Sequence, residues 1–179
     1  TGEKGRLQVG NATPWQPGKA YLYTLSVQFS GEQGADDAYS LAVGIRSVKV
    51  EGKRFLINGE PFYFTGFGKH EDSDLRGKAH DDVMMVHDFE LMNWIGANSF
   101  RTSHYPYAEE VLDYADRHGI VVINETAAVG LNMVIGKTLN PQVVEPKELY
   151  SEEGISKATQ QAHLAAIREL IARDKNHPC

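Results

Sequence analysis

The sequence contains little cysteine and no long apolar run, and both absences narrow what it can be. Its only cysteine is Cys179, which excludes disulfides and cysteine-based metal centres within one chain. No stretch of about 18 apolar residues occurs, so none of the chain is predicted to span a membrane. Lys and Arg (18 together) are outnumbered by Asp and Glu (24) and form no cluster, which argues against a nucleic-acid-binding face.

What the 179 residues do contain suits a globular protein that buries a core. Hydrophobic residues make up 41% and aromatic residues 9%, and the net charge is −6. By length this is one domain of ordinary size, or one small domain with part of another. Because Thr1 and Cys179 interrupt what reads as regular structure, we expect a segment of a longer protein.

Residues 1–45 are predicted to be β structure. Apolar and polar side chains alternate from Tyr21 to Phe29, the period of two that lets a strand bury one face. A polar, glycine-containing turn at 31–37 leads to a second strand at 39–45. Two or three strands are too few for a stable sandwich, so we expect the last strands of a larger β domain.

After residue 46, strands alternate with helices. The predicted strands lie at 62–67, 98–103 and 120–123, and the predicted helices lie at 83–95, from Pro106 to Gly119 and at 157–175. Asp81 or Asp82 is expected to cap the first helix. This order predicts an α/β fold with a parallel sheet, either doubly wound or the first three units of a (β/α)8 TIM barrel. The first strand–helix turn holds Gly66 and Gly68 but no third glycine at the dinucleotide-binding spacing, which favours the barrel.

Polar side chains follow each of the three predicted parallel strands, where a barrel gathers its functional groups. These residues are His70, Glu71, Asp72, His104, Tyr105, Asn124 and Glu125. Arg101 lies inside the second strand and needs a carboxylate partner. Glu125 is either that partner or a substrate contact. The other helix-associated histidines are expected at the surface or at helix ends: His87, His118, His163 and His177.

Two chemistries fit this arrangement. A metal-dependent hydrolase would use His70, His104 and Glu125 as ligands of one ion, although the compact H-E-x-x-H signature is missing. A glycoside hydrolase would use histidines and aromatic residues to hold sugar hydroxyls beside a carboxylate pair. The apolar loop at 130–147 would then be a substrate lid or a contact to another subunit.

Several stretches resemble glycoside hydrolase family 2, and together they extend over essentially the whole chain. They are Asn98-Ser-Phe-Arg101-Thr-Ser-His104-Tyr-Pro106 with Gly119-Ile-Val-Val-Ile123, Phe62-Tyr-Phe-Thr-Gly-Phe-Gly-Lys69-His70, Asn124-Glu-Thr-Ala-Ala-Val-Gly130 and Pro146-Lys-Glu-Leu-Tyr-Ser-Glu-Glu153. They are most similar to bacterial members that act on β-D-glucuronides. On that pattern, residues 1–45 are the C-terminal strands of an immunoglobulin-like β-sandwich. Residues 46–179 are the N-terminal part of a (β/α)8 catalytic barrel.

The resemblance implies a retaining glycosidase that cleaves β-D-glucuronides to glucuronic acid and an aglycone, with no metal and no other cofactor. Both catalytic Glu residues, the acid/base and the nucleophile, are expected beyond Cys179, so the segment alone is expected to be inactive. His104 matches a histidine that binds a sugar hydroxyl, and His70 matches a second histidine of the sugar pocket. Arg101 and Glu125 are candidates for support of the site.

The resemblance also extends to a loop. Residues 131–140 match an extra active-site loop, in which Ile135 and Leu139 would contact the aglycone. Two residues depart from the family pattern: Lys137 stands where an aliphatic residue is expected, and Lys69 replaces the usual Arg before the histidine.

The partners and alternatives follow from the same resemblance. It implies a small-molecule glucuronide as substrate, no nucleic acid, no membrane, a homo-oligomer (a tetramer) and a location in the bacterial cytoplasm. Another family 2 glycosidase, a β-galactosidase or β-mannosidase, is the near alternative, since the residues that read the uronate are expected beyond Cys179. The more distant alternative is a non-catalytic fragment that acts as a binding or assembly module.

Overall fold

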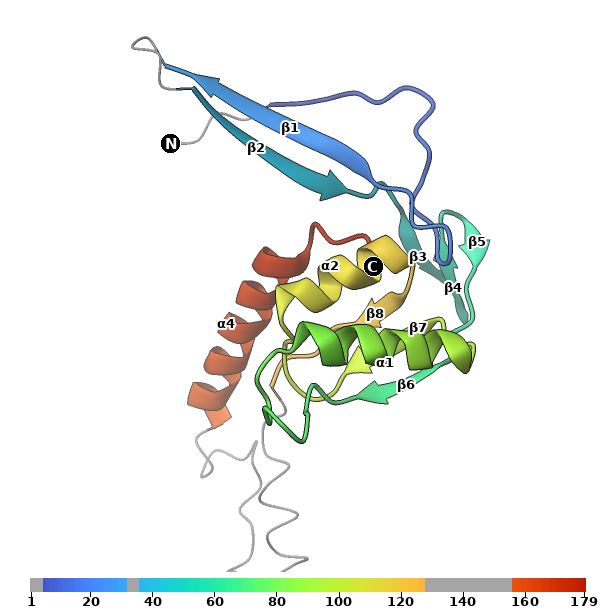
Figure 1. Cartoon of the computed structure of the whole chain (residues 1–179), viewed down its shortest axis with the longest axis vertical. Coiled ribbons are helices and arrows are strands. Elements are labelled where there is room, and N and C mark those ends of the chain that lie inside the picture. Colours follow the sequence, from blue (N-terminus) through green and yellow to red (C-terminus); the bar gives the residue numbers. More distant parts are fainter. Residues whose placement is uncertain (1–4, 32–35, 128–155) are drawn as a thin grey trace, which may run out of the picture.

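A computed structural model of the chain describes residues 5–31, 36–127 and 156–179. Within them, three small sheets follow one another along the chain. An antiparallel hairpin is formed by β1 (Tyr23–Ser30) and β2 (Asp36–Val43), and it extends away from the helices in Figure 1. A second antiparallel sheet is formed by β3 (Val48–Glu51), β4 (Arg54–Ile57) and β5 (Glu60–Pro61).

The third sheet is parallel, as the alternation of strands and helices predicts. Its strands are β6 (Gly66–Lys69), β7 (Ser99–Thr102) and β8 (Val121–Ile123), in that order. The first strand begins at Gly66 and not at residue 62, and the residues before it are bonded by the side chain of Asn98 in place of a regular ladder. Its Oδ1 accepts from Thr65 N at 2.8 Å, and its Nδ2 donates to the Tyr63 carbonyl at 2.8 Å.

Within the described ranges, three helices accompany this sheet: α1 (Asp82–Trp94), α2 (Glu109–His118) and α4 (Ser156–Asp174). Asp81 caps α1 by accepting from two backbone N–H groups of its first turn, which selects one of the two predicted caps. The prediction that Pro106 opens α2 is wrong, because the backbone stays extended through Ala108 (ψ 145°) and the helix begins at Glu109. Gly119 ends α2 with φ 70°, as predicted. Among the described helices, none combines the length and the apolar character needed to cross a membrane.

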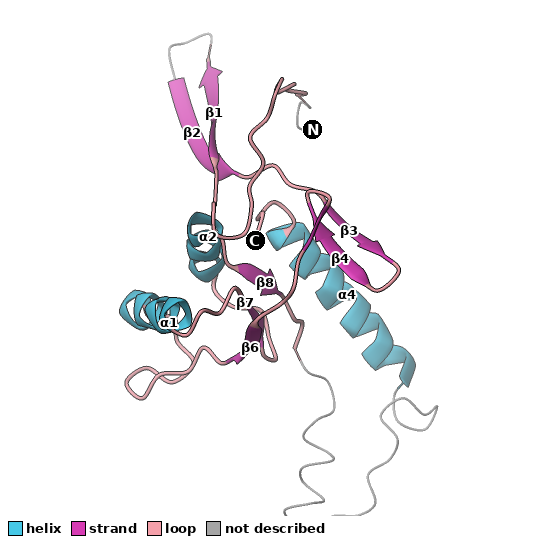
Figure 2. Cartoon of the chain, turned by 90° about the vertical axis from the view of Figure 1, so that its right-hand side faces the viewer, coloured by secondary structure: helices cyan, strands magenta, loops and turns pink. Residues whose placement is uncertain are grey.

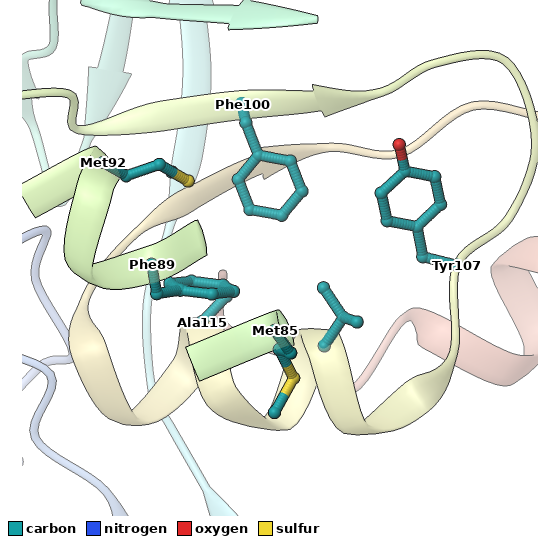
Figure 3. Packing of buried hydrophobic residues seen from close by; sticks show 7 residues of the cluster. Met85, Phe89, Met92, Phe100, Tyr107 and Ala115 are labelled. Atoms are coloured by element: carbon teal, nitrogen blue, oxygen red, sulfur yellow. The ribbon is translucent and has the colours of Figure 1, made fainter. Parts of the chain in front are cut away.

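One core cluster joins α1 and α2 to β7. Figure 2 shows both helices on the same side of the parallel strands, and Figure 3 shows Phe89 and Met92 of α1 beside Phe100 of β7. The rings of Phe89 and Phe100 lie edge to face, with centroids 5.8 Å apart. Tyr107, which is 1% exposed, closes the cluster at the end of the sheet where the strands finish. Helices on one side leave the opposite side of β7 free for Arg101.

Asp116 on α2 joins three separate parts of the chain. Its carboxylate accepts from the backbone N–H of Cys179 at 2.8 Å and lies 2.7 Å from Nδ1 of His177. Its backbone carbonyl accepts the indole N–H of Trp15 at 2.8 Å. Asp116 is 4% exposed and Trp15 is fully buried, so these bonds are shielded from water. His177, expected at the surface or at a helix end, is therefore a partner of a buried carboxylate.

The pairing of His177 with Asp116 predicts a dependence of stability on pH. The hydrogen bond to Asp116 raises the pKa of His177 above its ordinary value. Because this pKa is higher in the folded than in the unfolded state, the pair stabilises the fold fully below about pH 6.5, the pKa of an unfolded histidine. This stabilisation is lost as the pH rises through the pKa of the folded state. We expect His177→Gln to remove this part of the pH dependence, measured as the free energy of urea unfolding at a series of pH values.

The matched control is His87→Gln, the same change at a side chain that is 60% exposed on α1. It should leave the pH dependence of stability as it is in the unmodified protein. A His177→Gln curve parallel to that of the unmodified protein would contradict the role of the pair.

Candidate active site

The parallel register brings the ends of three strands to one edge of the sheet. Lys69 of β6 lies opposite Thr102 of β7, and Arg101 of β7 lies opposite Ile123 of β8. The residues that follow these positions are therefore neighbours in space. His70 and His104 meet there, with ring centroids 5.5 Å apart and ring planes at 77°. The sequence prediction that these two histidines share one edge is confirmed.

Glu125 lies between a cation and an imidazole. Its Oε1 is 2.9 Å from Nε of Arg101, and its Oε2 is 3.3 Å from Nδ1 of His104. Glu125 is thus the ion-pair partner of Arg101, as one of its two predicted alternatives had it. It also places the second oxygen against His104, a contact that the sequence pattern did not indicate. The peptide bond between Ser103 and His104 is cis.

Thr102 fixes the backbone of Glu125. Its hydroxyl oxygen accepts from the Glu125 N–H at 2.8 Å and donates to Oδ1 of Asn124 at 3.1 Å. The Asn124 amide in turn donates to Asp174 of α4 at 2.5 Å. Thr102 is fully buried, so its hydroxyl has no water to replace these partners. Sequence reasoning missed this residue, because a threonine in a strand gives no sign of which distant groups it bonds.

Glu71, Asp72 and Tyr105 hold loops together at the same edge. Oε1 of Glu71 accepts from Ala108 N at 3.2 Å, at the start of α2, where a negative charge is favourable. The Tyr105 hydroxyl accepts from the Glu71 N–H and donates to Asp72, each at 3.2 Å. Burial raises the pKa of Tyr105 above its ordinary value. These three candidates therefore brace the loops that carry His70 and His104.

Lys69 forms an ion pair with a residue of α1. Its Nζ lies 2.6 Å from Oδ2 of Asp88, and it donates to the His70 carbonyl at 3.1 Å. The carbonyl of Lys69 itself accepts from the hydroxyl of Tyr107. Lys69 thus anchors the end of β6, directly before His70.

The residues offered for a shared metal ion do not converge. Among the described residues, the one group with three ligand atoms close together is Asp113, Asp116 and His177, and none of these directly follows the end of a parallel strand. The carboxylate of Asp116 already accepts from Cys179 and faces His177. His70, His104 and Glu125 form no such group, so the metal-hydrolase alternative gains no support from their positions. Ile135 and Leu139, predicted to contact an aglycone, lie outside the described residues.

Comparison with known proteins identifies relatives over nearly the whole chain. The model of the TIM barrel domain of glycosyl hydrolases family 2 matches residues 48–179. A curated relative from Paenibacillus borealis named beta-glucuronidase is 56% identical over 178 residues, which cover 99% of this chain and 28% of the relative. Its counterpart from Mus musculus is 47% identical over 183 residues, which cover 99% of this chain and 26% of that protein.

The solved structures agree with the curated relatives. The structure of beta-D-glucuronidase from Dictyoglomus thermophilum has a TM-score of 0.82 and 52% sequence identity, and the match covers 95% of this chain and 28% of that one. A beta-glucuronidase from Ruminococcus gnavus has the same TM-score at 39% identity, with 99% of this chain and 28% of that one covered. The chain thus spans about 28% of the length of the first of these relatives.

The bonds of Thr102 predict that its hydroxyl stabilises the edge of the sheet more than its methyl group does. Thr102→Val keeps the shape but leaves the Glu125 N–H without its acceptor, so we expect a loss of about 2 kcal/mol in the free energy of unfolding. Thr102→Ser keeps the hydroxyl and loses one methyl group, for which we expect about 1 kcal/mol. Urea unfolding measures both, and a Thr102→Val variant as stable as the unmodified protein would show that the hydroxyl contributes nothing.

Proposed function

The chain belongs to glycosyl hydrolases family 2, and from this membership we propose that it is a segment of a longer retaining enzyme that cleaves β-D-glucuronides to glucuronic acid and an aglycone. The observation that carries the proposal is 56% identity to a protein named beta-glucuronidase over 99% of the chain. The meeting of His70 with His104 at the strand ends supports it. Because family 2 includes enzymes for neutral sugars, the choice of sugar needs its own experiment.

We propose that residues 46–179 are the N-terminal part of a (β/α)8 barrel. The sequential order of β6, β7 and β8, with α1 and α2 on one side, is the arrangement of consecutive barrel units. The carbonyl of Cys179 accepts from Val122 N at 2.9 Å, which is a ladder bond beside β8. The last residue thus lies where a further parallel strand of the barrel would pair.

We propose that residues 1–45 are the last strands of an immunoglobulin-like β-sandwich. Pairs such as Leu25 with Leu41 and Val27 with Tyr39 give the β1–β2 hairpin one apolar face. Tyr39 is 61% exposed on this face, and a two-stranded hairpin is marginally stable alone. A second sheet packed on the apolar face would supply the burial that the hairpin lacks.

We propose that His104 and His70 bind sugar hydroxyls and that Arg101 with Glu125 supports them. A neutral imidazole carries one donor and one acceptor, which matches a hydroxyl group. Family resemblance further suggests that Ile135 and Leu139 contact the aglycone, that no cofactor is needed, and that the full-length protein is a cytoplasmic homo-oligomer, a tetramer.

We propose that neither catalytic carboxylate lies within the 179 residues. Retaining hydrolysis needs an acid/base and a nucleophile with carboxyl groups about 5–5.5 Å apart. The carboxylate of Glu125 pairs with Arg101, and that of Glu71 accepts a hydrogen bond from the backbone at the start of α2. Both carboxylates therefore have partners within the fold. The two catalytic residues are therefore expected beyond Cys179.

We expect the full-length protein to release the chromophore from an aryl β-D-glucuronide and the isolated 179 residues to release none. The full-length protein should be less active on the matching aryl β-D-galactoside and β-D-mannoside. Preference for either neutral sugar would contradict the glucuronide assignment. Turnover by the isolated segment would contradict the placement of the carboxylates.

His104→Ala in the full-length protein tests the sugar-binding role. A hydrogen bond to a sugar hydroxyl strengthens in the transition state, so we expect kcat/KM to fall about 100-fold while the melting temperature changes little. His87→Ala, the same change at a side chain of α1 that is 60% exposed, should leave both values unchanged. A His104→Ala protein that fails to fold would show that His104 is structural.

A further inference from the structure

The carboxylate of Glu125 faces two groups with different hydrogen-bonding properties, a guanidinium and an imidazole. Oε1 lies 2.9 Å from Nε of Arg101, while Oε2 lies 3.3 Å from Nδ1 of His104. The backbone N–H of Glu125 is held by the hydroxyl of the buried Thr102 at 2.8 Å. One oxygen would suffice to pair the arginine, so the placement of the second oxygen against an imidazole requires its own explanation.

The explanation lies in which groups can donate. An ionised carboxylate offers acceptors only, and an arginine offers donors only. A ring nitrogen that faces a carboxylate is favoured when it carries the proton, so the position of Oε2 favours a proton on Nδ1 of His104. In the neutral ring, Nε2 then has a free lone pair and accepts a hydrogen bond. The other side of the His104 ring meets His70 edge to face, which restricts its rotation.

We infer that Glu125 is a positioning residue that holds His104 in the Nδ1-protonated form, so that Nε2 accepts a hydrogen bond from one particular hydroxyl of the sugar. This inference rests on the proposed function, since it assigns a tautomer to a histidine proposed to bind the sugar. It goes further by giving Glu125 a role in choosing which hydroxyl is accepted. The competing explanation is that Glu125 only neutralises Arg101.

Glu125→Gln separates the two explanations because the amide has one oxygen. Arg101 is donor-only and takes that oxygen, so the amide NH2 faces His104 and favours a proton on Nε2. The variant thus keeps a partner for Arg101 and inverts the hydrogen bond that His104 offers. Glu71→Gln is the matched control, since Glu71 lies at the same edge but bonds the start of α2.

The experiment uses the full-length enzyme with an aryl β-D-glucuronide and its 2-, 3- and 4-deoxy analogues. His104→Ala identifies the hydroxyl that His104 holds, since its loss of kcat/KM is smallest for the analogue lacking that hydroxyl. We expect Glu125→Gln to lose about tenfold on the parent substrate, the factor for one ordinary hydrogen bond. On the analogue that lacks the hydroxyl held by His104, Glu125→Gln should lose almost no kcat/KM. In the His104→Ala background, adding Glu125→Gln should lower kcat/KM by almost nothing further. Glu71→Gln should show no preference among the analogues.

Three outcomes overturn the inference in distinguishable ways. An equal loss by Glu125→Gln on every analogue, or full additivity with His104→Ala, would mean that Glu125 acts only through Arg101. If the unmodified enzyme does not hydrolyse the glucuronide, the proposed function itself is wrong and the inference falls with it. Should Glu125→Gln fail to fold, Glu125→Asp replaces it: the shorter carboxylate should lose activity alone but not in the His104→Ala background, and a loss in both would refute the inference.

Discussion

The parallel ladder of β6, β7 and β8 is the constraint on which the rest of the described structure depends. In such a ladder, equivalent residues of neighbouring strands lie side by side, so all three strands finish at one edge. Covering one face with α1 and α2 buries Phe100 and leaves Arg101 on the other face. The position of Arg101 opposite Ile123 then brings its guanidinium within reach of Glu125, two residues further along.

The hydrogen-bond capacity of the polar residues determines which of them remain available for a ligand. The carboxylate of Asp116 accepts from the backbone N–H of Cys179, and that of Asp88 pairs with Lys69. The carboxylate of Glu71 accepts from the backbone at the start of α2. Because a buried polar group that loses its partner is costly, these residues are not free to turn toward a substrate. His70 and His104 contact each other through their rings, which leaves ring nitrogens to meet a hydroxyl.

The sequence predicted elements better than it predicted partners. The alternation of strands and helices, the cap at Asp81 and the end at Gly119 follow from local periodicity and backbone preference, and they were confirmed. His177 and its partner Asp116 are 61 residues apart, and no local pattern encodes such a contact. The meeting of His70 with His104 was predictable because parallel strands share an edge, whereas their role in binding sugar remains a prediction from the family resemblance.

The cations at the strand ends are the first groups to consider as partners for the carboxylate of the proposed substrate. Both Lys69 and Arg101, the two that the strands themselves carry to this edge, are already paired, with Asp88 and Glu125. A paired cation attracts a third charge weakly, since its carboxylate partner repels that charge over nearly the same distance. The uronate carboxylate of the proposed glucuronide substrate would therefore gain little from either residue. On the proposed function, cations other than Lys69 and Arg101 must therefore bind the carboxylate of the sugar.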